Sequence, residues 1–179
     1  MDSNTFLISD LHLCHDRILE ADPPIRPFNN LDMMHAAIIN NWNSVVRDGD
    51  LVIVVGDVLI YSDNKEKLAV ADEILSELNG GKILVSGNHD VGYPRQELYR
   101  KHFNLIYGAY SLHENIITHI PVHPACLEHR WKRNIHGHLH HLSVLTPEGA
   151  KDKRYVNVSC EAVNFTPRSL KELTWSSHE

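Results

Sequence analysis

Cysteine and long apolar runs are scarce in this chain of 179 residues. The three cysteines, Cys14, Cys126 and Cys160, are odd in number and show no Cys-x-x-Cys spacing. This argues against a disulfide framework and against a structural zinc knuckle. No stretch approaches the roughly 18 apolar residues of a membrane span, and the first residues lack the basic and apolar parts of a secretory signal. We therefore expect a cytoplasmic protein that is neither exported nor inserted in a membrane.

Basic residues are also few, with 17 Lys and Arg against 23 Asp and Glu and a net charge of −6. Because no long Lys/Arg run is present, we expect no long duplex nucleic acid as a partner, and a small ligand instead. The length fits one domain spanning residues 1–179. The abundant residue is histidine, with 14 copies spread along the chain rather than gathered in a terminal tag. Histidine is the commonest metal ligand and carries protons near neutral pH.

The first half of the chain shows alternating strand and helix patterns. Apolar runs at 6–8, 51–55 and 82–85 predict buried strands. Between them, helical spacing predicts one helix over 31–46 and a second from Asp63 to Leu78, ended by Asn79-Gly80-Gly81. A proline-rich loop follows the first strand. Because crossover connections are right-handed, this β-α-β-α-β order predicts parallel strands with helices packed over the sheet.

The second half is expected to be rich in strands. After a short helix at 94–101, apolar segments predict strands at 105–107, 116–118, 133–135, 142–145 and 155–158, with a turn at 147–149 and a closing helix at 167–173. A second sheet needs a partner for its apolar face. The predicted fold class is therefore α/β, with two packed mixed β-sheets flanked by helices.

Polar motifs follow these apolar segments at several places. They are Ser9-Asp10-Leu11-His12, Gly56-Asp57-Val58, Gly87-Asn88-His89-Asp90 and His136-Gly137-His138-Leu139-His140. Ligands gather beyond the carboxyl ends of strands in α/β sheets, so these residues are expected to converge. Carboxylate, imidazole and carboxamide groups without thiolate favour a divalent ion such as Mn, Fe, Co, Ni or Zn. Two adjacent cations need a shared anionic bridge, for which Asp57 is the candidate.

These motifs resemble the calcineurin-like metallophosphoesterases, whose signature runs D-x-H, G-D, G-N-H-[D/E], H and G-H-x-H in that order. The resemblance implies an αββα sandwich that binds two divalent metal ions. One would be bound by Asp10, His12, Asp57 and His140. The other would be bound by Asp57, Asn88, His138 and a middle histidine. That histidine is expected to be His119, which ends an apolar strand before Ile120-Pro121. His123 is the competitor, and could instead face the substrate.

The resemblance also implies phosphate-ester hydrolysis, in which a water held between the metals attacks phosphorus. His89 would then donate a proton to the leaving group, with Asp90 orienting its imidazole. We expect Mn, and a phosphodiesterase acting on small nucleotide-type substrates. A phosphomonoesterase or nucleotidase, a nuclease, and a non-catalytic metal-bound scaffold are the alternatives. Arg17 and Arg26 are candidates for binding a substrate phosphate, and the equal alternative is that both are solvated at the surface. His15 is interpreted as supporting the ligands or as solvated.

Overall fold

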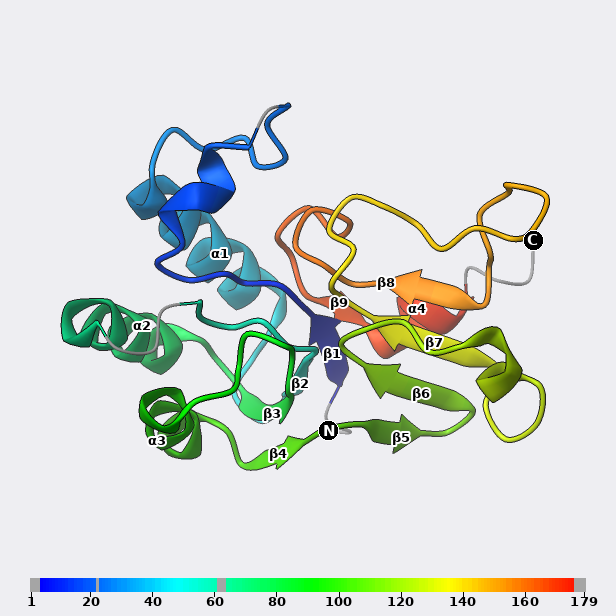
Figure 1. The fold of residues 1–179 in the computed structure, drawn as a ribbon. Coiled ribbons are helices and arrows are strands. Elements are labelled where there is room, and N and C mark those ends of the chain that lie inside the picture. Colours follow the sequence, from blue (N-terminus) through cyan, green and yellow to red (C-terminus); the bar gives the residue numbers. More distant parts are fainter. Residues whose placement is uncertain (1–3, 22, 61–63, 176–179) are drawn as a thin grey trace.

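The computed structural model describes residues 4–21, 23–60 and 64–175, which form two mixed β-sheets flanked by helices (Figure 1). The first sheet has the order β4-β3-β2-β1-β9 and the second has the order β5-β6-β7-β8. The predicted fold class is confirmed at this level. Within the described ranges, no helix is long and apolar enough to cross a membrane.

The first sheet is built from the predicted β-α-β-α-β unit. Strands β1 (Thr5–Ile8), β2 (Leu51–Val54), β3 (Gly81–Val85) and β4 (Leu105–Tyr107) pair in parallel, and β9 (Arg168–Ser169) pairs antiparallel to β1. Leu7, Ile53 and Leu84 are among the strand residues that are fully buried, as expected for a sheet covered on both faces. The carboxyl ends of β1, β2 and β3 therefore lie at one edge.

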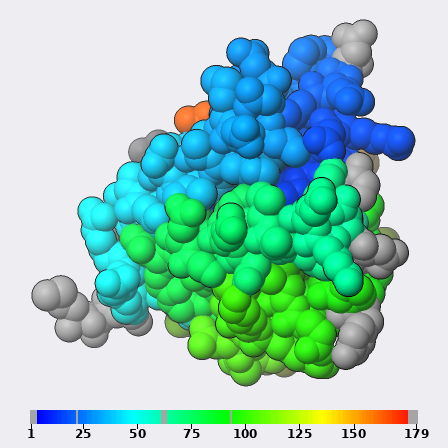
Figure 2. Space-filling model, turned by 90° about the vertical axis from the view of Figure 1, so that its left-hand side faces the viewer, coloured from blue at the N-terminus to red at the C-terminus, as the bar shows by residue number. Residues whose placement is uncertain are grey.

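Three helices cover the outer face of this sheet and form the surface seen in Figure 2. They are α1 (Leu31–Val45), α2 (Lys65–Glu77) and α3 (Tyr93–His102). The side chain of Asn30 caps α1, which buries Met34, Ile38 and Trp42 at helical spacing. Asn64 caps α2. Asp63, where we expected α2 to start, lies outside the described residues.

The second sheet comprises β5 (Tyr110–Leu112), β6 (Asn115–Thr118), β7 (Arg133–His136) and β8 (Tyr155–Asn157). Its residues Ile117 and Ile135 belong to the same buried cluster as Leu7 and Ile53 of the first sheet, so the two sheets share one core. A smaller cluster around Ile116, Leu127 and Tyr155 covers its other face. Leu127 belongs to the short helix η2 (Pro124–Leu127), and a second short helix, η1 (Asp16–Leu19), follows β1.

Several predicted elements were wrong in the second half. No strand forms at 142–145, where only Leu145 makes a bridge, to Lys151. Leu142 and Leu145 are 57% and 59% exposed, so neither has an apolar surface to pack against. The turn at 147–149 is confirmed by the hydrogen bond from Gly149 N–H to the carbonyl of Thr146. The closing helix begins later than expected, as α4 (Leu170–Trp175), because 168–169 joins the first sheet as β9. Strand β5 was not predicted.

Candidate metal centre

The strand ends bring six of the predicted ligands into two clusters. Asp10, His12 and His140 form the first cluster, and Asp57, His119 and His138 form the second. Within each cluster, one ligand atom from each residue lies within 4.8 Å of the others. The first cluster joins the exit of β1 to the loop after β7, and the second joins the exits of β2 and β6 to that same loop. The predicted convergence of distant motifs is therefore present.

Asp57 lies between the two clusters. Its Oδ2 is 3.2 Å from Nε2 of His119 in the second cluster and 3.8 Å from Nε2 of His12 in the first. In the first cluster, Oδ1 of Asp10 lies 3.6 Å from Nε2 of His12 and 3.9 Å from Nε2 of His140. A single carboxylate therefore reaches both groups of imidazoles, which is the position that a shared bridging ligand requires.

Three of the candidate ligand histidines, His12, His119 and His140, are held through Nδ1, which leaves their Nε2 atoms to bind a metal. Nδ1 of His119 is 2.8 Å from the Val55 carbonyl, and that of His12 is 3.1 Å from Nδ1 of His15. Such a bond from one ring nitrogen fixes the tautomer in which the other nitrogen can bind a metal. The contact also shows that His15 supports His12, one of the two roles we considered for it.

Three atoms of the clusters are buried and have no hydrogen-bond partner: Oδ1 of Asp10, Nε2 of His12 and Nε2 of His119. Buried polar groups are normally paired, because leaving one unpaired costs about 1–3 kcal/mol. Here the unpaired atoms are all electron-pair donors that point into the same small region. Divalent cations would satisfy all three, so the residues present fit a metal centre.

The carboxylates of the clusters are held in their charged form. Burial alone would raise the pKa of Asp10, but the nearby imidazoles of His12, His119 and His140 bring it well below its usual value. Burial likewise opposes ionisation of Asp57, and its interactions with His119 outweigh that effect and lower its pKa. Both side chains are consequently anions near neutral pH, the form that binds a cation.

Backbone strain is concentrated at the same residues. Asp10, His12, Asp57, His138 and His140 all have left-handed φ angles, of 58°, 50°, 55°, 67° and 51°. This region is unusual for residues other than glycine and costs on the order of 1–3 kcal/mol each where it is not otherwise favoured. Strained conformations of this kind cluster at functional sites. Their coincidence with the predicted ligands is independent support for a site here.

Two motif glycines allow the carboxylates to pack directly against backbone. A Cβ atom on Gly137 would lie 2.4 Å from Oδ2 of Asp10, and one on Gly87 would lie 2.2 Å from Oδ1 of Asp57. Neither distance can be tolerated, so any side chain at these positions would displace a cluster carboxylate. Glycine is thus required in the G-H-x-H and G-N-H-D motifs because a side chain there would collide with the carboxylate of Asp10 or Asp57, and not only because it favours a turn.

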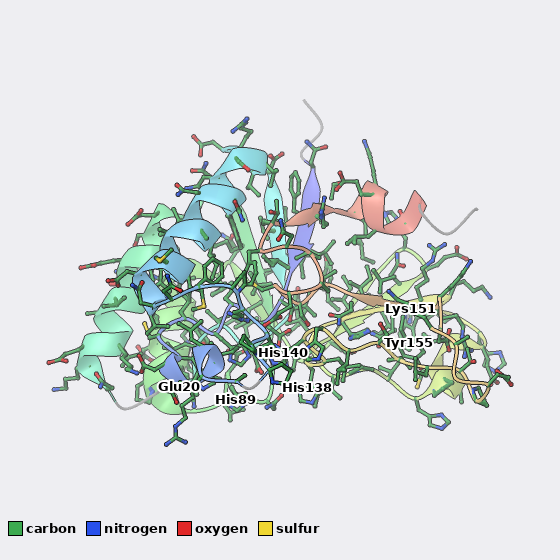
Figure 3. The ribbon with its side chains drawn as sticks, turned by 90° about the horizontal axis from the view of Figure 1, so that it is seen from above. Glu20, His89, His138, His140, Lys151 and Tyr155 are labelled. Atoms are coloured by element: carbon green, nitrogen blue, oxygen red, sulfur yellow. The ribbon has the colours of Figure 1, made fainter. Side chains whose placement is uncertain are left out.

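His89 lies beside the clusters and is exposed. Its ring centroid is 6.1 Å from that of His12, and its backbone N–H donates to Oδ1 of Asp57 at 3.0 Å. Asn88 precedes it in the same loop and is also exposed. Figure 3 shows His89, His138 and His140 near the meeting of the two halves of the molecule, with Tyr155 farther along the second sheet. An exposed imidazole beside buried ligands is accessible to a bound substrate.

Asp90 does not orient His89, contrary to our expectation. Its carboxylate is fully buried and accepts hydrogen bonds from the backbone N–H groups of Asp57, Val58 and Gly87. The hydroxyl of Tyr99 donates a fourth, at 2.8 Å. Asp90 therefore ties the loop after β3 to the loop after β2, and it stabilises the backbone that presents Asp57.

The predicted substrate contact of Arg26 was also wrong, whereas that of exposed His123 stays a prediction. Arg26 is only 2% exposed, and its guanidinium donates to the carbonyls of Asp10 and Leu11 rather than facing solvent. His123 caps η2 by accepting the N–H of Ala125, while His119 occupies the second cluster. Arg17 is exposed in η1, and its role stays a prediction.

Glu161 is a residue of the site that the sequence analysis missed. Its Oε1 is 3.0 Å from Nδ1 of His140 and 2.7 Å from Nε of Arg26. The signal that could have revealed it is its position, because it follows the strand predicted at 155–158 just as the other acidic ligands follow theirs. It was overlooked because no recognised motif surrounds it.

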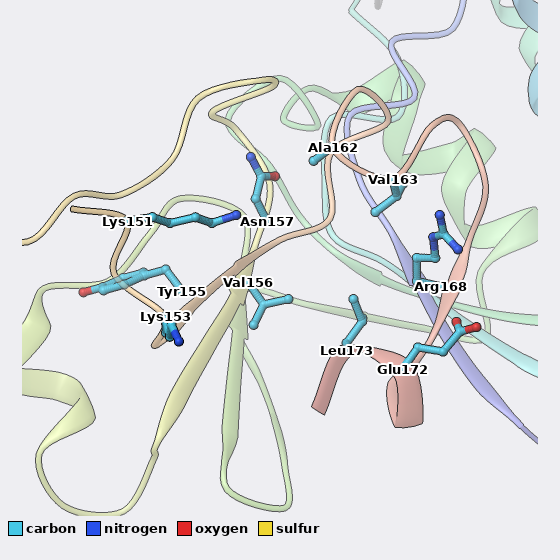
Figure 4. A pocket seen from close by; sticks show the side chains of 10 residues that line it. All are labelled: Lys151, Lys153, Tyr155, Val156, Asn157, Ala162, Val163, Arg168, Glu172 and Leu173. Carbon is cyan, nitrogen blue, oxygen red and sulfur yellow. The ribbon is translucent and has the colours of Figure 1, made fainter. Parts of the chain in front are cut away.

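A groove of about 540 Å³ lies between β8 and α4 and contains none of the candidate ligands (Figure 4). Lys151, Lys153 and Arg168 line it. Asn157 on its wall donates through Nδ2 to the carbonyls of His140 and Leu142. The groove is therefore next to the loop that bears His140 but outside the clusters themselves.

The chain is similar in sequence to one archaeal protein and to one bacteriophage protein. It is 37% identical over 166 residues to the uncharacterized protein MJ1445 of Methanocaldococcus jannaschii, which covers 92% of this chain and 86% of MJ1445. The chain belongs to the MJ1445 family. The Gene 66 protein of Mycobacterium phage L5 is 31% identical over 117 residues, or 65% of this chain and 52% of that protein.

The MJ1445 family fold is also found in a crystal structure. The protein of unknown function AQ665 from Aquifex aeolicus superimposes with a TM-score of 0.72 and 25% identity, covering 98% of this chain and 100% of that one. No protein-family model matches the chain. The solved structure therefore supports the architecture of this MJ1445 family member.

Proposed function

We propose that this chain is a calcineurin-like metallophosphoesterase that binds two divalent cations and hydrolyses phosphodiesters of small nucleotide-type substrates. The observation that carries the proposal is the pair of His/Asp clusters with Asp57 between them and three unpaired buried donor atoms. Oxygen and nitrogen donors without sulfur favour Mn, although Fe, Co, Ni and Zn accept the same ligands.

The two cations would supply neutralisation of the phosphate charge and activation of a water. The chain's own residues would hold them: Asp10, His12 and His140 at one position, Asn88, His119 and His138 at the other, and Asp57 shared between the two. His89 is exposed beside these residues, so its imidazole is free to donate a proton to the departing oxygen of the ester. Asp57, in turn, positions the backbone of His89 through Oδ1.

The test is a paired hydrolysis assay on metal-stripped protein reloaded with Mn, using bis-p-nitrophenyl phosphate and p-nitrophenyl phosphate. We expect the diester to be cleaved faster. The His89→Ala variant should lose about 10²–10⁴-fold in rate, the range of general acid catalysis, while retaining its metal content. His129→Ala, at an exposed position away from the clusters, is the matched control.

Each other outcome has a definite meaning. Faster cleavage of the monoester would replace the diesterase proposal by a phosphomonoesterase. Absence of cleavage of both esters by protein containing two Mn ions would reject the phosphoesterase proposal and favour a metal-bound scaffold. Equal losses in His89→Ala and His129→Ala would remove His89 from the catalytic role.

A further inference from the structure

The Nδ1 atoms of three ligand histidines have chemically different partners. His119 bonds to a neutral backbone carbonyl and His12 to the imidazole of His15. His140 is paired with a carboxylate, since its Nδ1 lies 3.0 Å from Oε1 of Glu161. A carboxylate fixes the ring orientation and raises the basicity of the imidazole more strongly than a neutral acceptor does. The imidazole of His140 thus has a carboxylate partner, which the imidazoles of His12 and His119 lack at Nδ1.

Glu161 is itself held by a buried cation. The ion pair between its Oε1 and Nε of Arg26 measures 2.7 Å, and the two side chains are 3% and 0% exposed. Arg26 also donates to the carbonyls of Asp10 and Leu11, at 2.5 Å and 3.0 Å. One guanidinium therefore connects Glu161 to the loop that carries Asp10 and His12.

The backbone of His140 is fixed separately. Nδ2 of Asn157 donates to its carbonyl at 2.8 Å, from the wall of the groove beside β8 (Figure 4). Because Asn157 holds the backbone, loss of Glu161 would free the imidazole ring without releasing the loop. The effect of Glu161 on the ring can therefore be separated from an effect on the loop.

We propose that Glu161 is a positioning residue that, anchored by Arg26, orients the imidazole of His140 and selectively sustains the first cation position. The inference rests on the proposed function only in requiring that the two clusters bind cations. His140 would present Nε2 toward Oδ1 of Asp10, which lies 3.9 Å away. The second cluster, whose His119 is held by the Val55 carbonyl, is independent of this arrangement.

The test is titration of metal-stripped protein with Mn²⁺, followed by calorimetry and by the signal of free Mn²⁺ in electron paramagnetic resonance. In Glu161→Gln, one of the two binding steps should weaken by about 10–100-fold, the usual effect of removing a partner of a metal ligand. The other step should be unchanged. Glu148→Gln, at an exposed turn position, is the control for loss of one carboxylate.

Two further variants separate positioning from a general structural role. In a His140→Ala background, adding Glu161→Gln should weaken binding no further, because Glu161 acts through that ring. Glu161→Asp keeps the charge facing Arg26 but shortens the reach to His140. It should weaken the same step to a smaller extent, and it provides the measurement if Glu161→Gln does not fold.

The outcomes distinguish this inference from the proposed function. Wild-type protein that binds no Mn²⁺ would overturn both. Two unchanged binding steps in Glu161→Gln would overturn the positioning role while leaving the metallophosphoesterase proposal intact. Equal weakening of both steps, or further weakening in the His140→Ala background, would also overturn it, because Glu161 would then support the whole site.

Discussion

Arg26 is a buried cation that donates hydrogen bonds to Glu161 and to two carbonyls beside the first cluster, and also to Sδ of Met34 in α1. Besides Glu161 and the two loop carbonyls, its guanidinium carbon lies 5.5 Å from the centre of the Phe165 ring. A buried ion pair is a weak source of net stability, yet removing one partner leaves an uncompensated charge. Removing the Arg26 side chain should therefore lower the free energy of unfolding more than removing any exposed arginine of the chain.

We predict that Arg26→Met lowers the free energy of unfolding by about 3–5 kcal/mol, the usual result of breaking a buried pair. The cause is the burial of Glu161 without its cation. Urea unfolding of the metal-free protein measures the change. Arg17→Met, which removes an exposed arginine, should shift stability by about 0.5 kcal/mol or less. Similar changes in the free energy of unfolding for both variants would show that the ion pair of Arg26 does not stabilise the fold.

The convergence of the candidate ligands could be predicted from sequence, and the contacts of several neighbouring residues could not. Asp10, His12, Asp57, His138 and His140 stand in motifs directly after apolar segments, so their meeting follows from strand direction. Arg26 stands in a proline-rich loop, and nothing local distinguishes a buried arginine from a solvated one. When buried, Arg26 is paired with Glu161, which lies 135 positions away in the sequence.

Among the elements, the loop between β3 and α3 shows how one side chain can organise a site without taking part in its chemistry. Asp90 accepts three backbone N–H groups and one hydroxyl. Those N–H groups belong to the loops that follow β2 and β3. In the G-N-H-D motif, Asp90 is therefore buried and bonds to the two loops, while His89 next to it is exposed to solvent.

We predict that Asp90→Asn lowers the free energy of unfolding by about 1–3 kcal/mol, because an amide group would face N–H donors that need acceptors. Tyr99→Phe, which removes only the hydroxyl donor, should cost about 1 kcal/mol. Chemical denaturation of the three proteins tests this order. An Asp90→Asn protein with wild-type stability but a rate loss equal to that of His89→Ala would contradict it and restore the pairing of Asp90 with His89.

The elements that periodicity could predict are those that bury a continuous face. Helix α1 and strands β1, β2 and β3 contact the shared core along their length, so their patterns are regular. The segment 142–145, Leu-Ser-Val-Leu, has three apolar residues but leaves Leu142 and Leu145 exposed. Strand β9 has two residues, too few to produce a pattern, and it exists only because β1 offers a free edge.

At the scale of the whole molecule, the metal centre sits where two sheets with a common core meet, and helix α1 is tied to it through His35. This side chain is 7% exposed, and its Nε2 accepts the N–H of Cys14, two residues after His12. Burial lowers the pKa of His35, and the more distant charges of Asp32 and Asp16 oppose this without reversing it. Acceptance of an N–H requires the neutral imidazole.

The pH dependence of stability follows from that shift. Because burial holds the folded-state pKa of His35 below the usual histidine value of about 6.5, the unfolded chain takes up a proton at a higher pH than the folded protein does. The stabilisation is therefore complete above about pH 6.5 and is lost as the pH falls from there through the folded-state pKa. The lowered pKa values of His12, His136 and His138 act in the same direction, and the raised pKa values of His119 and His140 oppose it. The effects of Asp10 and Asp57 begin at lower pH.

We predict that metal-free protein loses stability between pH 7.5 and pH 5.5, and that His35→Gln loses less over the same interval. The glutamine carbonyl can accept the N–H of Cys14 and does not titrate, so it removes the proton uptake while keeping the bond. Urea unfolding at both pH values gives the two differences, with His129→Gln as the exposed control. Equal pH slopes in wild type and His35→Gln would exclude His35 as a source of the acid sensitivity, and would leave it to His136 and the histidines of the metal centre.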